Sequence, residues 1–145
     1  MSRRLAAMAL IAIAPVALSA CAASTVREAS ADALTPDQML LLDRNLGGKV
    51  AGRTVSCISS RTANQTIRVS DDILLYRVSG NLVYRNDLRS SCPGLARDDD
   101  IMVSNIRGSG PCRGDIIRLV DRASGITGAS CVLGEFTPYR TARTD

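Results

Sequence analysis

The stretch "LLYRVSGNLVYRN", residues 74–86, decides the fold class of this chain. Its two halves are rich in aliphatic and aromatic residues, which favour extended strands. Gly80-Asn81 stands between them, and these residue types suit the two-residue turn of a β-hairpin. The stretch therefore predicts two antiparallel strands joined by a tight turn, which is a basic unit of an all-β domain.

The position of the turn also predicts which residues lie opposite each other in this hairpin. A two-residue turn there places Arg77 opposite Tyr84 and Tyr76 opposite Arg85. Cross-strand neighbours interact directly, and a cation beside an aromatic ring contributes about 0.5–1 kcal/mol. We therefore expect the hairpin to carry two arginine–tyrosine pairs.

Further strand-like runs follow one another from residue 50 onward, at a spacing of about ten residues. Glycine, asparagine, aspartate and serine separate most of them. This pattern predicts a mainly β protein, built as a small antiparallel β-sandwich or barrel with one short N-terminal helix. Besides the hairpin, the predicted strands are "RTVSCIS" (53–59), "QTIRV" (65–69), "DIMVSNI" (100–106), "GDIIRLVD" (114–121) and "SCVLGEFTPY" (130–139).

The helix is predicted within "LTPDQMLLLDRNLGG", residues 34–48. Thr35 suits the N-cap, Pro36 the first helical position, and Gln38 completes a capping box. Gly47 or Gly48 is expected to end the helix. An apolar stripe along it predicts packing against the protein's own sheet, with a membrane or partner contact as the alternative. The stripe consists of Met39, Leu42 and Leu46, and Leu34 with Met39 would form a hydrophobic staple.

The first 20 residues have the three parts of a secretory signal peptide. Arg3 and Arg4 form a positive start, Leu5 to Leu18 form an apolar segment, and Ser19-Ala20 supply small residues before the cut. A membrane-spanning helix needs about 20 apolar residues, so this segment is short for a transmembrane anchor. The leader therefore predicts export from the cytoplasm.

The end of the leader, Leu18-Ser19-Ala20-Cys21, resembles the lipobox of bacterial lipoproteins. In that family the cysteine thiol receives a diacylglycerol, the leader is cut before it, and the new amine is acylated, for which palmitate is expected. The resemblance implies that Cys21 is the lipid-attachment residue. Several acyl chains anchor a protein firmly, at about 0.8 kcal/mol per buried CH₂. Ala22, rather than aspartate, follows the cysteine and favours the outer membrane, on its periplasmic side.

The leader and anchor divide the chain into four parts. Residues 1–20 are the predicted signal peptide, and residues 21–33 are small and polar, which predicts a flexible tether. Residues 34–140 form the predicted β domain with its helix, and residues 141–145 a flexible tail. Without the two leader arginines, 16 basic groups face 14 acidic groups, so the net charge of +4 falls to +2.

Four cysteines remain once Cys21 is assigned to lipid. An even number of cysteines in an exported domain predicts two disulfides, and three pairings are possible. We expect Cys92–Cys112, because this bond closes the turn-rich segment between the two residues. We also expect Cys57–Cys131, because it ties the first predicted strand to the last. Each bond contributes about 2–4 kcal/mol.

Composition argues against several function classes. The chain has three tyrosines, one phenylalanine, no tryptophan and no histidine. Scattered arginines with few aromatic rings are a poor match to a nucleic-acid interface, so no nucleic-acid partner is predicted. Without histidine and without closely spaced cysteines, no zinc site, other metal or cofactor is predicted. Asp98-Asp99-Asp100 offers oxygen ligands for Ca²⁺ but lacks the spacing of a calcium loop, and a solvated acidic loop is the preferred interpretation.

Enzyme chemistry finds little support in the residue types. The absence of histidine excludes histidine-dependent triads and dyads. A serine–lysine dyad would have to use Lys49, the chain's single lysine, which follows two glycines. A pair of carboxylates can act as general acid and base, and Asp72 and Asp87 near the open end of the hairpin are the candidates. The prediction is nevertheless a non-enzyme, with no catalytic residue.

The cysteine contexts resemble an uncharacterised family of short proteobacterial envelope proteins, a domain of unknown function. The residues that carry the resemblance are "SCIS", "DDILLYRVSGNLVYRNDLRSSCPGL" and "GASCVLGEFTP", within residues 52–138. The resemblance implies a secreted or lipid-anchored domain and no catalytic residue.

Three functions remain open at this point. The first is a non-catalytic envelope lipoprotein whose β domain binds a protein or glycan. The second is an inhibitor of an exogenous hydrolase such as lysozyme, and the third is a carboxylate-based enzyme. The anchor, the tether and the missing catalytic groups favour the first.

Overall fold

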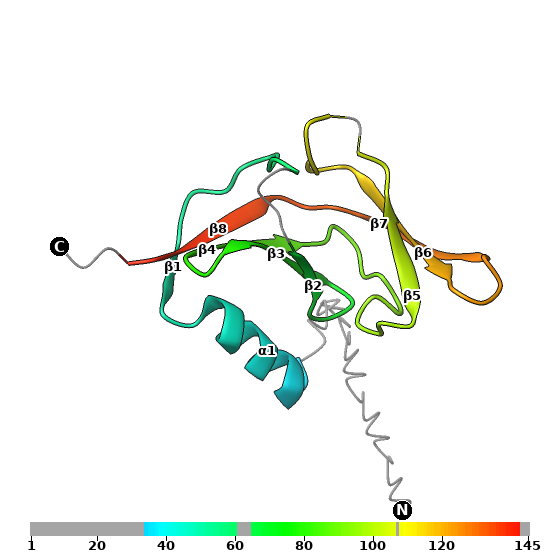
Figure 1. Cartoon of the computed structure of the whole chain (residues 1–145), viewed down its shortest axis with the longest axis horizontal. Coiled ribbons are helices and arrows are strands. Elements are labelled where there is room, and N and C mark those ends of the chain that lie inside the picture. Colours follow the sequence, from blue (N-terminus) through cyan, green and yellow to red (C-terminus); the bar gives the residue numbers. More distant parts are fainter. Residues whose placement is uncertain (1–33, 61–64, 107, 143–145) are drawn as a thin grey trace, which may run out of the picture. The chain divides into compact units, whose positions relative to one another are not determined.

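The computed structural model describes residues 34–60, 65–106 and 108–142 (Figure 1). The predicted signal peptide, Cys21 and the tether lie outside the described residues, as does the end of the tail. The mainly β class with one short N-terminal helix is confirmed. In chain order the described elements are α1 (Pro36–Leu46), β1 (Lys49–Ala51), β2 (Gln65–Arg68), β3 (Ile73–Ser79), β4 (Leu82–Asp87), β5 (Asp100–Ser104), β6 (Ile116–Asp121), β7 (Thr127–Val132) and β8 (Phe136–Thr141).

The strands form two antiparallel sheets that face each other as a sandwich. The large sheet has the order β1-β8-β4-β3-β2, and the small sheet has the order β5-β6-β7. The two sheets meet on one side, where the Arg89 N–H donates to the Val132 carbonyl at 3.0 Å. On the other side the edge strands are β2 and β5, which no strand pairing joins. Within the described residues the sheets therefore do not close into a barrel.

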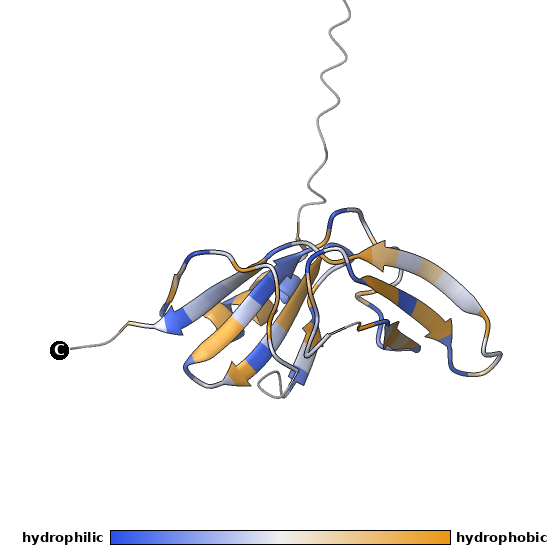
Figure 2. Cartoon of the chain, turned by 90° about the horizontal axis from the view of Figure 1, so that it is seen from above, coloured by the Kyte–Doolittle hydropathy of each residue, from blue (hydrophilic) through white to orange (hydrophobic). Residues whose placement is uncertain are grey.

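Both faces of the large sheet are covered, which explains the unbroken apolar run at the start of β3. Leu74 and Tyr76 face the small sheet, in a core cluster that also holds Phe136 and Leu119. Tyr76 and Phe136 meet edge to face, with ring centroids 5.4 Å apart. Leu75, which stands between Leu74 and Tyr76 in the sequence, points to the opposite face, where it is fully buried against α1. Figure 2 shows hydrophobic and hydrophilic residues interspersed along the strands as a whole.

The hairpin of β3 and β4 turns at Gly80-Asn81 as predicted, but the predicted register is wrong. Tyr76 lies opposite Tyr84, and Arg77 lies opposite Val83. The cause is a β-bulge between Arg77 and Ser79, which adds one residue to β3 and shifts every pair beyond it. The two expected arginine–tyrosine pairs are therefore replaced by a tyrosine pair on the inner face.

The start of α1 is as predicted. The Thr35 hydroxyl accepts a hydrogen bond from the Gln38 N–H at 3.3 Å, and the Gln38 side chain accepts one from the Thr35 N–H at 2.9 Å. The predicted packing of the helix on the sheet is also confirmed, with one correction to the stripe. Met39 is 51% exposed, so it belongs neither to the stripe nor to a staple, and Leu41 packs on the sheet instead.

Near the C-terminal end of α1, the buried Asn45 connects the helix to β3. The Asn45 side chain accepts a hydrogen bond from the Arg77 guanidinium and donates to the Leu41 carbonyl at 2.8 Å. The Lys49 ammonium donates to the Asn45 carbonyl at 2.8 Å. A cation at this end of a helix also interacts favourably with the helix dipole.

The segment 53–59 is not the strand that its sequence predicts. β1 pairs with β8 and ends at Ala51, and after it only isolated bridges remain, Val55 with Phe136 and Cys57 with Cys112. The register to β8 slips by one residue between Ala51 and Val55, which interrupts the ladder. The predicted strand 130–139 is likewise two strands, because the chain leaves the small sheet after Val132 and joins the large one at Phe136.

The four cysteines form two disulfides, as predicted, but with a different pairing. Cys57 is joined to Cys112, and Cys92 to Cys131. Cys57 lies directly opposite Cys112 in the antiparallel bridge, with their Cα atoms 4.0 Å apart. Cys131 points from β7 into the core, where it meets Cys92, and both are almost fully buried. An inward residue of β7 cannot reach the exposed Cys57, so the expected pairing is wrong.

Candidate functional site

The open side of the sandwich is a groove between the edges of β2 and β5, which we call the mouth. It has a volume of about 410 Å³ and is lined by Gln65, Thr66, Ile67, Arg68, Ala96, Asp98 and Met102. A smaller cavity of about 130 Å³ shares Thr66 and Met102 with it and extends past Tyr76 and Ser104. The mouth is therefore lined by both polar and apolar residues.

Arg68 closes one end of the mouth by spanning from β2 to the start of β5. Its guanidinium donates to the Arg97 carbonyl at 3.1 Å and to the Asp100 carbonyl at 3.0 Å. One of its nitrogens also lies 3.7 Å from a carboxylate oxygen of Asp98. The side chain is only 14% exposed, so these contacts pair a largely buried cation. Arg68 thus joins the two sheets where no main-chain ladder does.

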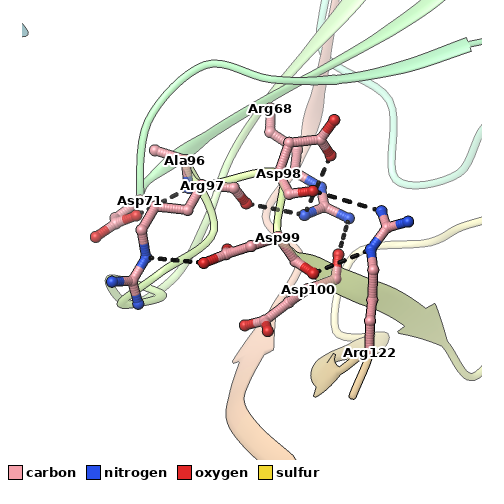
Figure 3. Close-up of polar contacts among 8 residues, drawn as sticks. All are labelled: Arg68, Asp71, Ala96, Arg97, Asp98, Asp99, Asp100 and Arg122. Atoms are coloured by element: carbon pink, nitrogen blue, oxygen red, sulfur yellow. Dashed lines mark hydrogen bonds and ion pairs between the residues drawn. The ribbon is translucent and has the colours of Figure 1, made fainter.

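A second arginine, Arg122, binds the main-chain carbonyls of Asp98 and Asp99 in the loop before β5 (Figure 3). The Arg122 guanidinium donates to the Asp99 carbonyl at 3.0 Å and to the Asp98 carbonyl at 3.4 Å. The carboxylates of Asp98 and Asp99 turn outward and are 90% and 66% exposed. Main-chain carbonyls are typical Ca²⁺ ligands, and here arginine donors occupy those of residues 97–100. The acidic run is therefore a surface loop held by two arginines.

Another pocket lies on the far side of this loop, beside the start of α1. It has a volume of about 540 Å³ and is lined by Thr35, Gln38, Ser70, Asp71, Asp72, Gly94, Ala96 and Arg97. Asp71 is engaged in holding the loop, because its carboxylate accepts a hydrogen bond from the Ala96 N–H at 3.0 Å (Figure 3). This pocket is open to solvent, and polar and apolar surface contribute to it about equally.

The two carboxylates that the sequence suggested as an acid–base pair belong to neighbouring positions at the open end of the hairpin, where the Leu88 N–H donates to the Asp72 carbonyl at 2.8 Å. Asp72 lines the pocket beside α1, whereas Asp87 does not. The Asp87 carboxylate is bound instead by the Arg85 guanidinium, at distances of 2.6–3.1 Å. Lys49, the candidate for a serine–lysine dyad, is bound to the helix carbonyl of Asn45. Of these three groups, Asp72 alone lines the pocket beside α1.

Tyr76 is the aromatic residue of the smaller cavity. Burial raises the pKa of its phenol above the usual range, and the Asp115 carboxylate adds to the shift. The phenol therefore stays protonated at any physiological pH. In the smaller cavity it is therefore a neutral hydrogen-bonding group.

Two residues that hold the sandwich together escaped prediction from the sequence. Arg68 looked like an ordinary polar residue of an edge strand, and Asn86 like one of a hairpin. Asn86 is fully buried, and its amide exchanges hydrogen bonds with the main chain of Gly134 at 2.9 and 3.0 Å. This clamp holds the connection from β7 to β8, where the chain passes between the sheets. In the sequence, the only sign of this clamp was Gly134, a turn-forming residue within an apolar run.

No family model, curated protein or solved structure matches the chain. The resemblance to a family of proteobacterial envelope proteins therefore stays a prediction from the sequence. Among the described residues, no helix is long and apolar enough to cross a membrane. In the same part of the chain, no three residues of the types that ligate metals are grouped closely enough to hold an ion.

Proposed function

We propose that this protein is a lipoprotein of the bacterial cell envelope, whose β domain binds a partner protein or glycan without catalysis. Lipid at Cys21 would hold the domain at the outer membrane on the periplasmic side, and residues 22–33 would let it reach a partner. The leader, with its lipobox-like end, supports this location in the cell envelope. Two disulfides suit an oxidising compartment and support the same location.

The observation that carries the binding role is the mouth. It is a groove of about 410 Å³ between two sheet edges, and its polar residues are Gln65, Thr66 and Arg68 of β2 and Asp98 of the loop before β5. Rigid strands that present polar groups along a groove suit recognition of an elongated partner. Of the two carboxylates suggested as an acid–base pair, Asp87 is bound by the Arg85 guanidinium, and Asp72 lines a different pocket, beside α1.

Mass spectrometry and cross-linking test this proposal. The protein is expressed with its leader in a Gram-negative host, and the mature N-terminus is analysed. We expect acyl mass on Cys21, outer-membrane fractionation, and loss of both in Cys21→Ser. Chemical cross-linking in intact envelopes should then yield a saturable adduct. An unacylated Cys21 would overturn the anchor, and the absence of any saturable adduct would overturn the binding role.

A further inference from the structure

Within the described residues, the outer edge of β2 carries main-chain groups that have no hydrogen-bond partner. The Val69 N–H donates to the Ile73 carbonyl at 3.0 Å, which marks these two residues as a hydrogen-bonded pair of the β2–β3 ladder. Hydrogen-bonded and non-hydrogen-bonded pairs alternate in an antiparallel ladder. The main-chain N–H and C=O groups of Thr66 and Arg68 therefore point away from β3. They make no hydrogen bond to any other residue that the structure describes.

The outer edge of β5 follows the same rule. The Asn105 N–H donates to the Ile116 carbonyl at 3.2 Å, and these residues continue the β5–β6 register as a hydrogen-bonded pair. By alternation, the main-chain groups of Asp100, Met102 and Ser104 point away from β6. The Asp100 carbonyl indeed accepts its bond from the Arg68 side chain, on the outer side. The groups of Met102 and Ser104 have no such partner in the described part of the chain.

Both edges line one continuous space. Thr66 from β2 and Met102 from β5 belong to the mouth and also to the smaller cavity, which Tyr76 and Ser104 line as well. Free main-chain donors and acceptors thus stand on both walls, at the spacing of a β-ladder. Unpaired edges of this kind are templates for the addition of another strand. At the end of the mouth, the Arg68 guanidinium already donates to the outward carbonyl of Asp100, which an added strand would otherwise bind.

We propose that the mouth binds an extended peptide segment of a partner protein, which adds as a strand along β5 and faces β2. The segment bonds to the main-chain groups of Met102 and Ser104 and to those of Thr66. Successive side chains of an extended segment point to opposite sides, so a small apolar side chain at one position enters the cavity beside Tyr76. This inference rests on the proposed binding function and names the chemistry of the partner.

A peptide fits this groove better than a glycan. The groups that face it are alternating N–H and C=O groups of two strands, which match another main chain. The residues that line the two spaces also include the hydroxyl-bearing Thr66 and Ser104, together with Met102 and Tyr76. A ring-stacking platform for a sugar would need an exposed aromatic face, whereas Tyr76 is 5% exposed.

Ser104→Pro and Ser104→Ala form a matched pair of variants for the test. Proline removes the outward N–H of residue 104 but breaks no β5–β6 hydrogen bond, because position 104 is not hydrogen-bonded to β6. Alanine removes only the hydroxyl and keeps the N–H. Twelve-residue peptides selected from a random displayed library on the full-length wild-type protein in detergent serve as the probe. We expect about tenfold weaker peptide binding by Ser104→Pro and unchanged binding by Ser104→Ala.

Amide hydrogen exchange locates the peptide independently of the variants. A bound strand should slow exchange at Thr66, Met102 and Ser104. If Ser104→Pro lowers the melting temperature so far that it does not fold, peptides N-methylated at alternate residues replace it on the wild-type protein, and they should bind at least tenfold more weakly. Failure to enrich any peptide, equal affinity of Ser104→Pro, or slowed exchange only outside the mouth would overturn the inference.

A glycan arm separates this inference from the proposed function. A tetramer of N-acetylglucosamine is titrated into the wild-type protein under the same conditions. If it slows exchange in the mouth and no peptide does, strand addition is wrong while the binding function stands. If the envelope cross-linking described above yields no saturable adduct, the proposed function fails, whatever the selected peptides do.

Discussion

Replacing Asn86 with leucine should destabilise the domain by about 3 kcal/mol. Asn86 is fully buried, and its amide accepts a hydrogen bond from the Gly134 N–H and donates to the carbonyls of Gly134 and Glu135. Leucine preserves most of the volume but leaves a buried donor and a buried acceptor without partners. Each such group costs about 1–3 kcal/mol, so two of them account for the expected loss. This is a large share of the roughly 5–15 kcal/mol by which a domain is stable.

Equilibrium urea unfolding with both disulfides intact, followed by far-ultraviolet circular dichroism, measures this effect. The midpoint should fall while the slope with urea stays unchanged, since the folded and unfolded surfaces are nearly the same. Asn105→Leu makes the same chemical change at an exposed position and should shift stability by no more than about 0.5 kcal/mol. A loss below 1 kcal/mol in Asn86→Leu would show that the amide does not hold the passage between the sheets.

Three further predictions follow from local geometry. Because Cys57 is exposed and the other disulfide is almost fully buried, a mild thiol should reduce Cys57–Cys112 first, and alkylation followed by peptide mapping detects the order. The hydroxyl and N–H of Ser124 donate to the Asp121 carboxylate and lower its pKa. These hydrogen bonds therefore stabilise the fold above the pKa that Asp121 has in the unfolded chain, and this stabilisation is lost as the pH falls through the folded pKa. Ser124→Ala should raise the pKa of Asp121, which a carbon-13 titration by nuclear magnetic resonance measures. Gly134→Ala should prevent native folding, since a Cβ there would meet a main-chain oxygen of the large sheet at 1.9 Å, and a wild-type-like melting curve would contradict this.

Much of the local structure was open to prediction because its causes are local. The capping box at Thr35 and the turn at Gly80-Asn81 depend on residues within three or four positions, and both formed as expected. The hairpin register failed because a bulge near Val78 adds one residue, which no turn signal reveals. The sequence of residues 53–59 likewise does not distinguish a short strand from a segment that makes only isolated bridges.

The candidate site was less accessible from the sequence, because its contacts join distant residues. The acidic run Asp98–Asp100 stood out by composition. Its partner Arg68, however, lies 32 positions before Asp100, and Arg122 lies 23 positions after Asp99. Such pairs become visible only when the edges of two sheets are placed beside each other.

The sequence by itself determined the β class, the start of the helix, the hairpin turn and the presence of two disulfides. These follow from periodicity, turn chemistry and an even count of cysteines in the domain. Only the tertiary structure decided that Cys131 meets Cys92, that Asn86 clamps the passage between the sheets, and that the sandwich stays open between β2 and β5. The physical reason is that each depends on which inward faces meet in the core, and packing across the whole domain sets that outcome.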